Sequence, residues 1–404
     1  MPRVLFAAHA CYLDDSSGAA VASRALMEML ARGGSAVEVL CGASLDLDRE
    51  LDLGAWLQSR GHAVAADVPE TWTLDPAGEP VMSPSHYRLC ARGVPITVQR
   101  GPTTRPHHPG PAEVAEFLTL LDAVARRLRP EVVLTYGGGP LGRAIPGRAA
   151  GLGAAAVFAL HNLSYRDPDA FRGYDATLVP SAYAAEHYRA TLGLRCAAIP
   201  CAVDFERALA VDPTPRYLTF VNPSPEKGVW AFARIAEVLG RARPDIPVLV
   251  VESRGTEASV AACGLELRGL GTVSFHPHTG DPRRFWRVTR ALLMPSLWEE
   301  SQGLAAVEAM LNGIPVVASD RGALPETIGD AGCLLPLPGR LTPATAEAPT
   351  AEEVAPWVAA VVRLWDDPAH ARDLARRAAD RARLWSPEAL WSRYDAFFAA
   401  LRRR

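Results

Sequence analysis

The sequence predicts an α/β fold with two parallel sheets, because apolar strands alternate with amphipathic helices in two successive series. The first series begins at the apolar run 4–8, and the second begins at 217–221, after a connector over 206–216. Strand–helix–strand repeats are typical of parallel sheets, which bind ligands at the carboxyl ends of their strands. We therefore expect two doubly wound, Rossmann-like domains that face a cleft.

The length of 404 residues agrees with more than one domain. We place an N-terminal domain over 1–205 and a C-terminal domain over 206–385. The last segment, 386–404, has apolar residues at helical spacing and predicts a separate amphipathic helix.

The first half is expected to open with a strand over 3–8, a long polar loop, a helix over 20–32 and a strand over 37–40. Two less regular strands are predicted at 62–66 and 94–98, the second at a sheet edge because it contains Pro95. The remaining elements are a helix over 112–128 and strands at 132–134, 154–160, 176–179 and 197–199.

The second half repeats the alternation and ends in helices. Its expected strands are 217–221, 247–251, 273–275, 291–294 and 315–318, and its expected helices are 228–241, 281–288, 302–312, 351–366 and 368–384.

Charge and cysteine content exclude several classes of protein. The net charge of −3 gives no electrostatic reason to expect nucleic acid as a partner. The seven cysteines are scattered and form no C-x-x-C pair, which favours a reducing compartment over a disulfide framework or a zinc site. No apolar run is long enough to span a membrane, and we expect no signal peptide, because strand 4–8 follows the first residues directly. We expect a cytoplasmic protein.

The stretch 295–310 carries the strongest functional signal. Ser301 is a suitable N-cap for a helix that ends at Asn312-Gly313, and Gly303 lets a ligand approach the free N–H groups of Ser301, Gln302, Gly303 and Leu304. Glu300 precedes this helix, and Glu308 lies on its apolar face, where a carboxylate needs hydrogen-bonding partners. Two carboxylates beside an anion site suit a ligand with phosphates and hydroxyls, such as a nucleotide sugar.

Lys227 is the only lysine among the 42 lysine and arginine residues. A position that keeps lysine in such a chain indicates a need for a compact ammonium rather than a guanidinium. Lys227 also lies in the first strand-to-helix turn of the second half, Pro225-Glu226-Lys227-Gly228.

These motifs together resemble the retaining GT-B glycosyltransferases of family 4, also called glycosyl transferases group 1. The resemblance rests on Pro-Ser-x-x-Glu at 295–299, the Glu300 and Glu308 pair, the run 313–320 and Pro225–Gly228. It implies that Glu300 faces the donor sugar, Glu308 binds the ribose, and Lys227 neutralises the leaving diphosphate. It also implies that the final helix crosses back to the first domain.

The chain departs from that family at the first turn of the second half. Asn222-Pro223 stands where many relatives have Gly-Arg, whose arginine also holds the diphosphate. We keep Asn222 as a donor-side residue and predict that Arg254, at the end of the next strand, replaces the missing arginine. A surface ion pair is the alternative for Arg254.

The first half supplies the other candidates. By the resemblance, Gly18 lets the backbone approach the donor or acceptor, and His161 lies at the reaction centre; a capping role is the alternative for His161. His9 and Tyr12 are candidates for the acceptor side, as are His107 and His108 in the Pro/His-rich loop 102–111.

Two weaker motifs are discounted. Asp46-Leu47-Asp48 matches a metal-binding D-x-D, but we interpret it as a solvated helix start. Gly137-Gly138-Gly139 is not a dinucleotide fingerprint. We predict no metal ligands and no cofactor, with the nucleotide sugar as substrate.

The predicted function is transfer of a sugar from a nucleoside-diphosphate sugar to an acceptor, with retention and without a metal. The acceptor is expected to be a small soluble metabolite, and a homodimer is possible. Two alternatives stay open: an enzyme such as an epimerase that uses this fold without acceptor transfer, and a non-catalytic nucleotide-sugar-binding protein.

Overall fold

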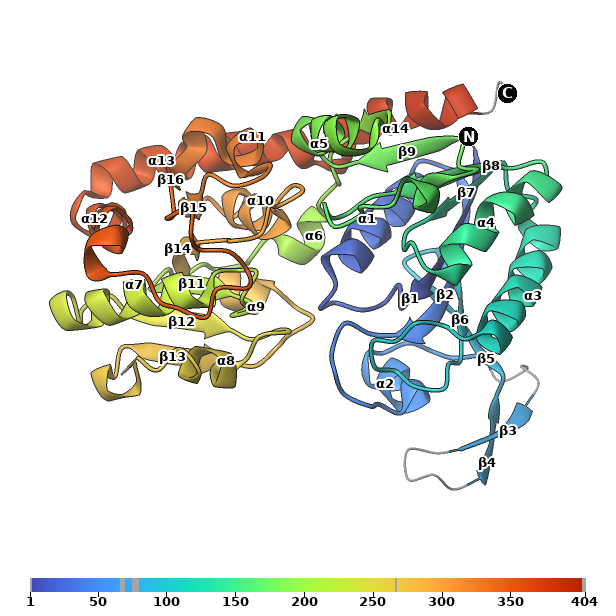
Figure 1. Cartoon of the computed structure of the whole chain (residues 1–404), viewed down its shortest axis with the longest axis horizontal. Coiled ribbons are helices and arrows are strands. Elements are labelled where there is room, and N and C mark those ends of the chain that lie inside the picture. The colour runs from blue at the N-terminus through green and yellow to red at the C-terminus, as the bar shows by residue number, and fades with distance from the viewer. Residues whose placement is uncertain (1, 66–69, 75–79, 266, 402–404) are drawn as a thin grey trace. The chain divides into compact units, whose positions relative to one another are not determined.

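The computed structural model describes residues 2–65, 70–74, 80–265 and 267–401, and it describes no side chains over 70–74 and 80–84. Contacts divide the chain into two compact units (Figure 1). Unit 1 comprises Met1–Pro180, Ala185–Cys201 and Leu390–Arg404, and unit 2 comprises Ser181–Ala184 and Ala202–Ala389. Each unit is an α/β domain with its own largely parallel sheet, which confirms the predicted fold class.

Unit 1 contains an eight-stranded sheet in the order β10-β9-β8-β7-β1-β2-β6-β5. Its strands are β1 (Arg3–Ala10), β2 (Ala36–Ser44), β5 (His86–Ala91), β6 (Val94–Gln99), β7 (Val132–Thr135), β8 (Ala155–Ala159), β9 (Ala176–Val179) and β10 (Cys196–Ala198). All neighbours pair in parallel except β5 and β6, which are antiparallel. The chain runs from β1 to one side and later returns on the other side at β7. The carboxyl ends of β1 and β7 therefore form a topological switch point.

Helices cover this sheet because their apolar stripes match the buried strand residues. They are α1 (Gly18–Arg32), α2 (Leu53–Ser59), α3 (Pro111–Leu128), α4 (Pro140–Gly151), η1 (Pro168–Phe171) and α5 (Ala182–Leu192). Phe117, Leu121 and Val124 of α3 are spaced by four and three residues and therefore lie on one face of the helix. They pack against Leu5 and Leu40 of the sheet. A separate antiparallel pair joins β3 (Glu70–Leu74) and β4 (Pro80–Pro84).

Three local predictions in this half were wrong. Residues 62–65 form no strand, and residue 66 of that prediction lies outside the described residues. β6 is not an edge strand; β2 pairs with it from Ile96 onward, so Pro95 lies beyond that ladder. Residues 46–49 bend as a loop, and α2 starts only at Leu53, where the Asp52 side chain caps it.

Unit 2 contains a six-stranded parallel sheet in the order β13-β12-β11-β14-β15-β16. Its strands are β11 (Tyr217–Val221), β12 (Val248–Val251), β13 (Val273–His276), β14 (Thr289–Met294), β15 (Val316–Ser319) and β16 (Gly332–Leu335). The chain runs outward from β11 through β12 and β13, then crosses to β14. The switch point of this sheet is therefore at the carboxyl ends of β11 and β14.

Two layers of helices bury the faces of the unit 2 sheet. The helices are α6 (Phe205–Ala208), α7 (Val229–Ala242), α8 (Glu257–Ala261), η2 (Arg268–Leu270), α9 (Arg283–Trp286), α10 (Leu304–Leu311), α11 (Leu324–Ile328), η3 (Gly329–Ala331), α12 (Ala351–Asp366), α13 (Pro368–Ala382) and η4 (Arg383–Trp385). Leu293 of β14 joins the core formed with α7 and α12, whereas Leu292 and Met294 join the core that includes α10. This alternation follows from the two-residue period of a strand.

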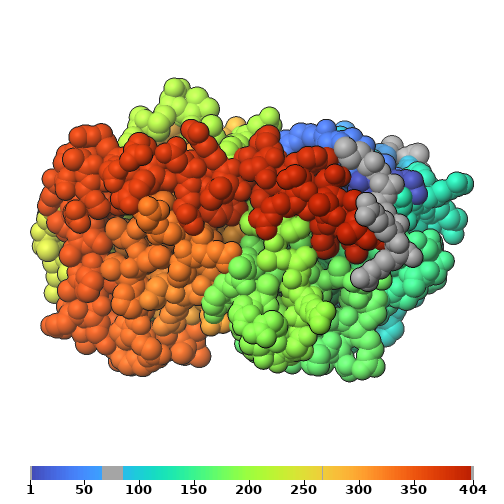
Figure 2. Space-filling model, turned by 90° about the horizontal axis from the view of Figure 1, so that it is seen from above, coloured from blue at the N-terminus to red at the C-terminus, as the bar shows by residue number. Residues whose placement is uncertain are grey.

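The last helix, α14 (Pro387–Leu401), belongs to unit 1 from Leu390 onward. The Tyr394 hydroxyl donates to Pro200 O at 2.9 Å, and Arg393 Nη2 donates to Ala198 O at 2.6 Å. The C-terminal helices, coloured red, lie at the surface in Figure 2. Within the described part of the chain, no helix has the length and hydropathy needed to cross a bilayer.

Candidate functional site

Charged residues follow both strands at the switch point of unit 2. Lys227 lies in the turn after β11, and Glu300 lies in the turn after β14. Lys227 Nζ donates to Glu300 Oε1 at 2.5 Å, and the Ser296 hydroxyl donates to the same oxygen at 2.7 Å. The Lys227 and Glu300 side chains are only 24% and 9% exposed. The two residues singled out in the sequence thus form a partly buried ion pair where parallel sheets bind ligands.

The two turns that carry this ion pair are in direct backbone contact. The N–H groups of Leu297 and Trp298 both donate to Glu226 O at 2.9 Å. Gly228 has φ +79°, and a Cβ at this position would lie 1.9 Å from Pro295 O. Only glycine fits so close an approach in this conformation, so Gly228 sets the separation of Lys227 from the β14 turn.

Replacing Gly228 with alanine is expected to destabilise unit 2 by on the order of 2–3 kcal/mol, because left-handed strain adds to overpacking. Gly264→Ala is the matched control. Gly264 also has a positive φ of +67°, but no atom lies within 4 Å of its Cβ position. The control should cost only about 1 kcal/mol. Equal effects in urea unfolding would show that the contact with Pro295 is unimportant.

The helix after Glu300 begins later than predicted. α10 starts at Leu304, and its N-cap is Gly303 at φ +86°, not Ser301. Thr327 Oγ1 donates to Gln302 O at 2.6 Å and holds the preceding turn. The first turn of α10 still has N–H groups without intrahelical acceptors, at Leu304 and the residue after it, which makes it a suitable site for a phosphate oxygen.

Glu308 lies on the inner side of α10 as predicted and has a partner that the prediction missed. The indole Nε1 of the buried Trp286 donates to Glu308 Oε2 at 3.1 Å. Burial raises the pKa of Glu308 to about 7, although Trp286 and the positive charge of Arg207 act in the opposite direction. The carboxylate is therefore under-solvated at neutral pH and would gain from additional hydroxyl donors.

Asn222 lies in the turn after β11, whereas Arg254 lies in the loop after β12. Asn222 has a left-handed φ of +60°, and its Oδ1 accepts the Gly255 N–H at 2.9 Å. A Cβ on Gly255 would lie 2.2 Å from the Pro223 carbonyl. Asn222 thus ties the β11 turn to the β12 loop, while the Arg254 side chain in that loop is exposed. The structure leaves the donor roles of both residues as predictions.

In unit 1, His161 follows β8 and lines a small, mainly apolar cavity together with Ser23, Cys201 and Tyr394. Its Nε2 lies 3.5 Å from the Ser23 hydroxyl, and its Nδ1 lies 3.9 Å from the Cys201 sulfur. The Tyr136 ring packs edge-on at 5.4 Å. Burial lowers the pKa of His161 to about 4, so the ring is neutral at physiological pH and acts as a hydrogen-bonding group rather than a cation.

Gly18 and Tyr12 differ in their access to a ligand. Gly18 is exposed at the first position of α1, with Ser17 as N-cap, so backbone N–H groups of the first turn are accessible there. Tyr12 is only 1% exposed and packs on Phe6 with ring centroids 5.6 Å apart. The Tyr12 side chain is therefore part of the core in this structure, and its acceptor-side role stays a prediction.

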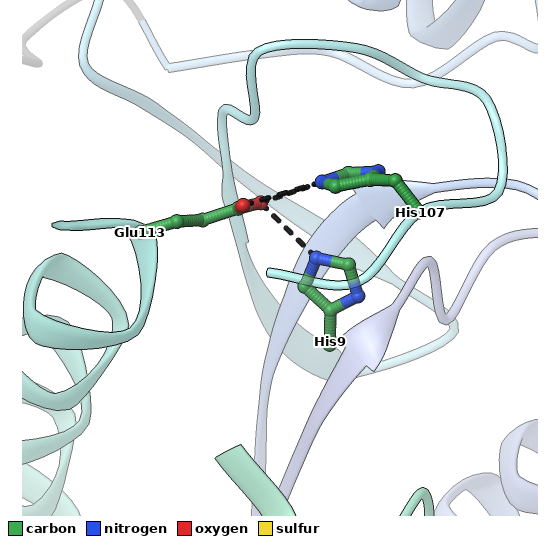
Figure 3. A group of neighbouring side chains, drawn as sticks. All are labelled: His9, His107 and Glu113. Carbon is green, nitrogen blue, oxygen red and sulfur yellow. Dashed lines mark hydrogen bonds and ion pairs between the residues drawn. The ribbon is translucent and has the colours of Figure 1, made fainter. Parts of the chain in front are cut away.

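His9 and His107 were predicted separately, and the structure brings them together around Glu113 (Figure 3). His9 Nε2 lies 3.0 Å from Glu113 Oε1, and His107 Nε2 lies 3.1 Å from the same oxygen. Burial lowers the pKa of His9, partly offset by Glu113. His108 is exposed and is not part of this contact group.

Sequence reasoning missed three partners of the predicted residues: Ser296, Trp286 and Glu113. Ser296 had a signal, since it belongs to the quoted Pro-Ser motif. Trp286 and Glu113 had none, because each meets its partner through the tertiary fold, across 22 residues to Glu308 and 104 residues to His9.

Known protein families match both the N-terminal and the C-terminal half of the chain. The family described as "Glycosyltransferase Family 4" matches residues 16–207, and the family described as "Glycosyl transferases group 1" matches residues 215–350. The two matches together cover most of the chain. The chain belongs to the family 4 glycosyltransferases with the GT-B fold.

Named relatives of this family 4 glycosyltransferase match shorter stretches. A D-inositol 3-phosphate glycosyltransferase of Arthrobacter sp. is 29% identical over 163 residues, covering 38% of this chain and 35% of the relative. A 2-deoxystreptamine glucosyltransferase of Streptomyces kanamyceticus is 38% identical over 150 residues, covering 36% of this chain and 34% of the relative. The chain thus matches about a third of the length of these relatives.

Solved structures match this family 4 glycosyltransferase over nearly its whole length. Anabaena HepE in complex with UDP and glucose has a TM-score of 0.68 at 15% identity, with 99% of this chain and 100% of that chain covered. Sucrose-phosphate synthase from Thermosynechococcus elongatus has a TM-score of 0.66 at 19% identity, with 98% and 99% covered. At this level of identity the likeness shows the fold alone.

Proposed function

We propose that this chain transfers a sugar from a nucleoside-diphosphate sugar to a small soluble acceptor, with retention of the anomeric configuration. The observation that carries the proposal is the Lys227–Glu300 ion pair at the switch point, beside the N-terminus of α10. A compact cation next to unpaired helix N–H groups fits a diphosphate. Glu308, whose charged form lacks solvation, fits the hydroxyls of a ribose.

In the proposed reaction the bond between the anomeric carbon and the diphosphate oxygen breaks, and the electron pair leaves with the diphosphate. Lys227 then shifts its hydrogen bond from Glu300 to the departing phosphate, whose charge it neutralises together with the α10 N–H groups. Glu300 then becomes available to accept hydrogen bonds from the hydroxyls of the donor sugar. The acceptor oxygen forms its bond on the same face of the sugar, and its proton passes to the departing phosphate oxygen.

In this proposed reaction, protein groups stabilise the negative charge that develops on the departing diphosphate. The reaction therefore needs no metal ion at the diphosphate. His161, neutral because of its burial, would hydrogen-bond the transferred sugar or the acceptor rather than carry charge. We propose Gly18 as the backbone approach in unit 1, since its helix start is exposed.

A small soluble acceptor agrees with the names of two relatives, which act on D-inositol 3-phosphate and 2-deoxystreptamine. UDP-sugars are the first donors to consider, because the similar HepE structure holds UDP and glucose. We propose a cytoplasmic location, which fits seven cysteines that are all free thiols. Formation of a homodimer stays a prediction.

The test measures nucleoside diphosphate release from UDP-, GDP- and dTDP-glucose, with and without 2-deoxystreptamine or D-inositol 3-phosphate. We expect slow donor hydrolysis that an acceptor accelerates, and an anomeric proton coupling in the product that matches the donor. Binding without any turnover would indicate a nucleotide-sugar-binding protein, and turnover to an isomeric nucleotide sugar would indicate an epimerase. Neither binding nor turnover would overturn the proposal.

A further inference from the structure

Three side chains with metal-ligating atoms converge in unit 1 near the switch point of its sheet. His9 lies near the carboxyl end of β1, His107 lies in the loop 102–111, and Glu113 lies in the first turn of α3. His107 Nε2 is 3.1 and 3.2 Å from the two Glu113 oxygens, and His9 Nε2 is 3.0 Å from one of them. Figure 3 shows both imidazoles directed at the same carboxylate from different segments.

The hydrogen bonds of His107 indicate which ring nitrogen carries a proton and which one faces Glu113. Its Nδ1 lies 3.0 Å from Arg105 O, and a carbonyl oxygen only accepts, so Nδ1 carries the proton. A neutral His107 ring then presents the bare lone pair of Nε2 to the Glu113 carboxylate, which is repulsive. Either a second ring proton or a cation between the two groups relieves this repulsion. A ring N–H bound to a backbone carbonyl is the usual arrangement of a metal-ligating histidine.

The loop that carries His107 is held in place without any ion. The Ser44 hydroxyl donates to Arg105 O at 3.3 Å, and Leu45 N donates to Thr104 O at 2.9 Å. Glu50 accepts the Thr104 N–H at 2.9 Å. These bonds link the loop to the end of β2 and to the segment before α2, so His107 is positioned before any ligand arrives.

The helix that carries Glu113 is anchored in the same way. Gln99 at the end of β6 donates through Nε2 to Glu113 O at 2.9 Å. The side chains of His9, His107 and Glu113 are 16%, 18% and 11% exposed. They are therefore largely desolvated yet reachable, which suits an ion that keeps an open coordination position.

We propose that His9, His107 and Glu113 form a binding site for one divalent transition-metal ion of the zinc class. Two imidazole nitrogens and one carboxylate are a ligand set of three-ligand zinc sites. Ligands at about 2.1 Å in tetrahedral geometry are about 3.4 Å apart, a few tenths of an ångström longer than the nitrogen–oxygen separations seen here. All three ligand atoms lie within 4.8 Å of one another. Binding therefore requires small side-chain shifts, and each of the two rings must present its Nε2 lone pair to the ion.

His9, His107 and Glu113 belong to unit 1, whereas Lys227 and Glu300 belong to unit 2. The proposed metal site goes beyond the proposed sugar transfer and does not depend on it.

The test uses the full-length chain without a histidine tag, stripped with EDTA and then titrated with Zn²⁺ or Co²⁺. We expect about one equivalent of bound ion by calorimetry and elemental analysis, with a Co²⁺ visible spectrum typical of nitrogen and oxygen ligands. Glu113→Gln and His107→Ala should each weaken binding at least about 100-fold, since loss of an outer-shell partner alone costs about 10–100-fold.

His108→Ala is the matched control, because His108 adjoins His107 but is exposed and outside the cluster. It should bind the ion as the unchanged protein does. Circular dichroism of each variant checks folding, and His9→Ala provides an independent loss if one variant does not fold. A wild-type chain that binds no ion, equal binding by the cluster variants, or a thiolate-to-Co²⁺ charge-transfer band would each overturn the proposal. None of these readouts involves donor or acceptor, so sugar transfer is tested separately.

Discussion

Lys227→Ala is expected to lower the kcat for sugar transfer by about 10²–10³-fold, the usual cost of removing one preorganised group that stabilises transition-state charge. Lys227 Nζ lies at the switch point of unit 2 and bonds to Glu300, so it stands beside the proposed diphosphate position. The developing charge on the leaving group exceeds that of the bound donor. The effect should therefore fall mainly on kcat, and the KM for the donor should change less.

Lys227→Arg is the matched variant, because it keeps the positive charge and changes only the shape of the cation. We expect it to retain more activity than the alanine variant but less than the unchanged chain, since the guanidinium is larger and planar. The measurement is initial-rate kinetics with saturating acceptor, alongside thermal unfolding to verify the fold. Full kcat in the alanine variant would remove Lys227 from the reaction.

Glu308→Gln is expected to weaken nucleotide binding and to stabilise the protein at every pH above the ordinary carboxyl pKa of 4.5. The amide accepts ribose hydroxyls less strongly than a carboxylate, which corresponds to about a 10-fold higher Kd for the nucleoside diphosphate at pH 8. At that pH the amide avoids the larger desolvation cost of a buried, charged carboxylate in the unliganded protein. Replacing a residue that served stability alone would not weaken nucleotide binding while stabilising the protein.

The pH dependence of stability follows from the raised pKa of Glu308. Its folded-state pKa is about 7, above the ordinary value of 4.5, because burial disfavours the charged form. Between these values the unfolded chain has released a proton that the folded chain keeps, so the stability from this group falls as pH rises. The Glu308→Gln variant should equal the unchanged protein below about pH 4.5 and exceed it by on the order of 3 kcal/mol at pH 8, since one pKa unit corresponds to about 1.4 kcal/mol.

The measurements for Glu308→Gln are calorimetric titration with nucleoside diphosphate and urea unfolding at several pH values. Glu347→Gln is the control, since Glu347 lies exposed in a loop of the same unit. It should change neither quantity. Unchanged nucleotide affinity in Glu308→Gln would remove the ribose role, and a constant stability difference across pH would contradict the titration.

Much of the fold was predictable because strand and helix periods are local properties of the sequence. The helix predicted over 351–366 coincides with α12, and the strand predicted over 217–221 coincides with β11. The predicted helix stop at Asn312-Gly313 was also correct, since α10 ends at Leu311 with Asn312 as its C-cap. Amphipathic spacing and stop residues act within a few positions of each other, so one sequence suffices to read them.

Errors occurred where tertiary context overrode a local preference. Ser301 is a good N-cap residue, yet α10 starts after Gly303, because the Thr327 hydroxyl holds the preceding turn and Gly303 adopts a left-handed φ of +86°. A Cβ added at Gly303 would lie 2.7 Å from Leu324. Pro95 is typical of an edge strand, yet β6 is interior, since the ladder from β2 begins beyond it. In both cases the deciding contact comes from a distant part of the chain, so the sequence around Ser301 or Pro95 carries no signal for it.

The sequence by itself determined two α/β units and an inward-facing Glu308, and it singled out Lys227 and Glu300 as candidates. Only the tertiary structure decided which side chains meet. It paired Lys227 with Glu300 across 73 residues and joined His9 to Glu113 across 104 residues. Periodicity and capping depend on neighbours within one or two turns, whereas these contacts depend on strand order, which places distant carboxyl ends of parallel strands at one sheet edge.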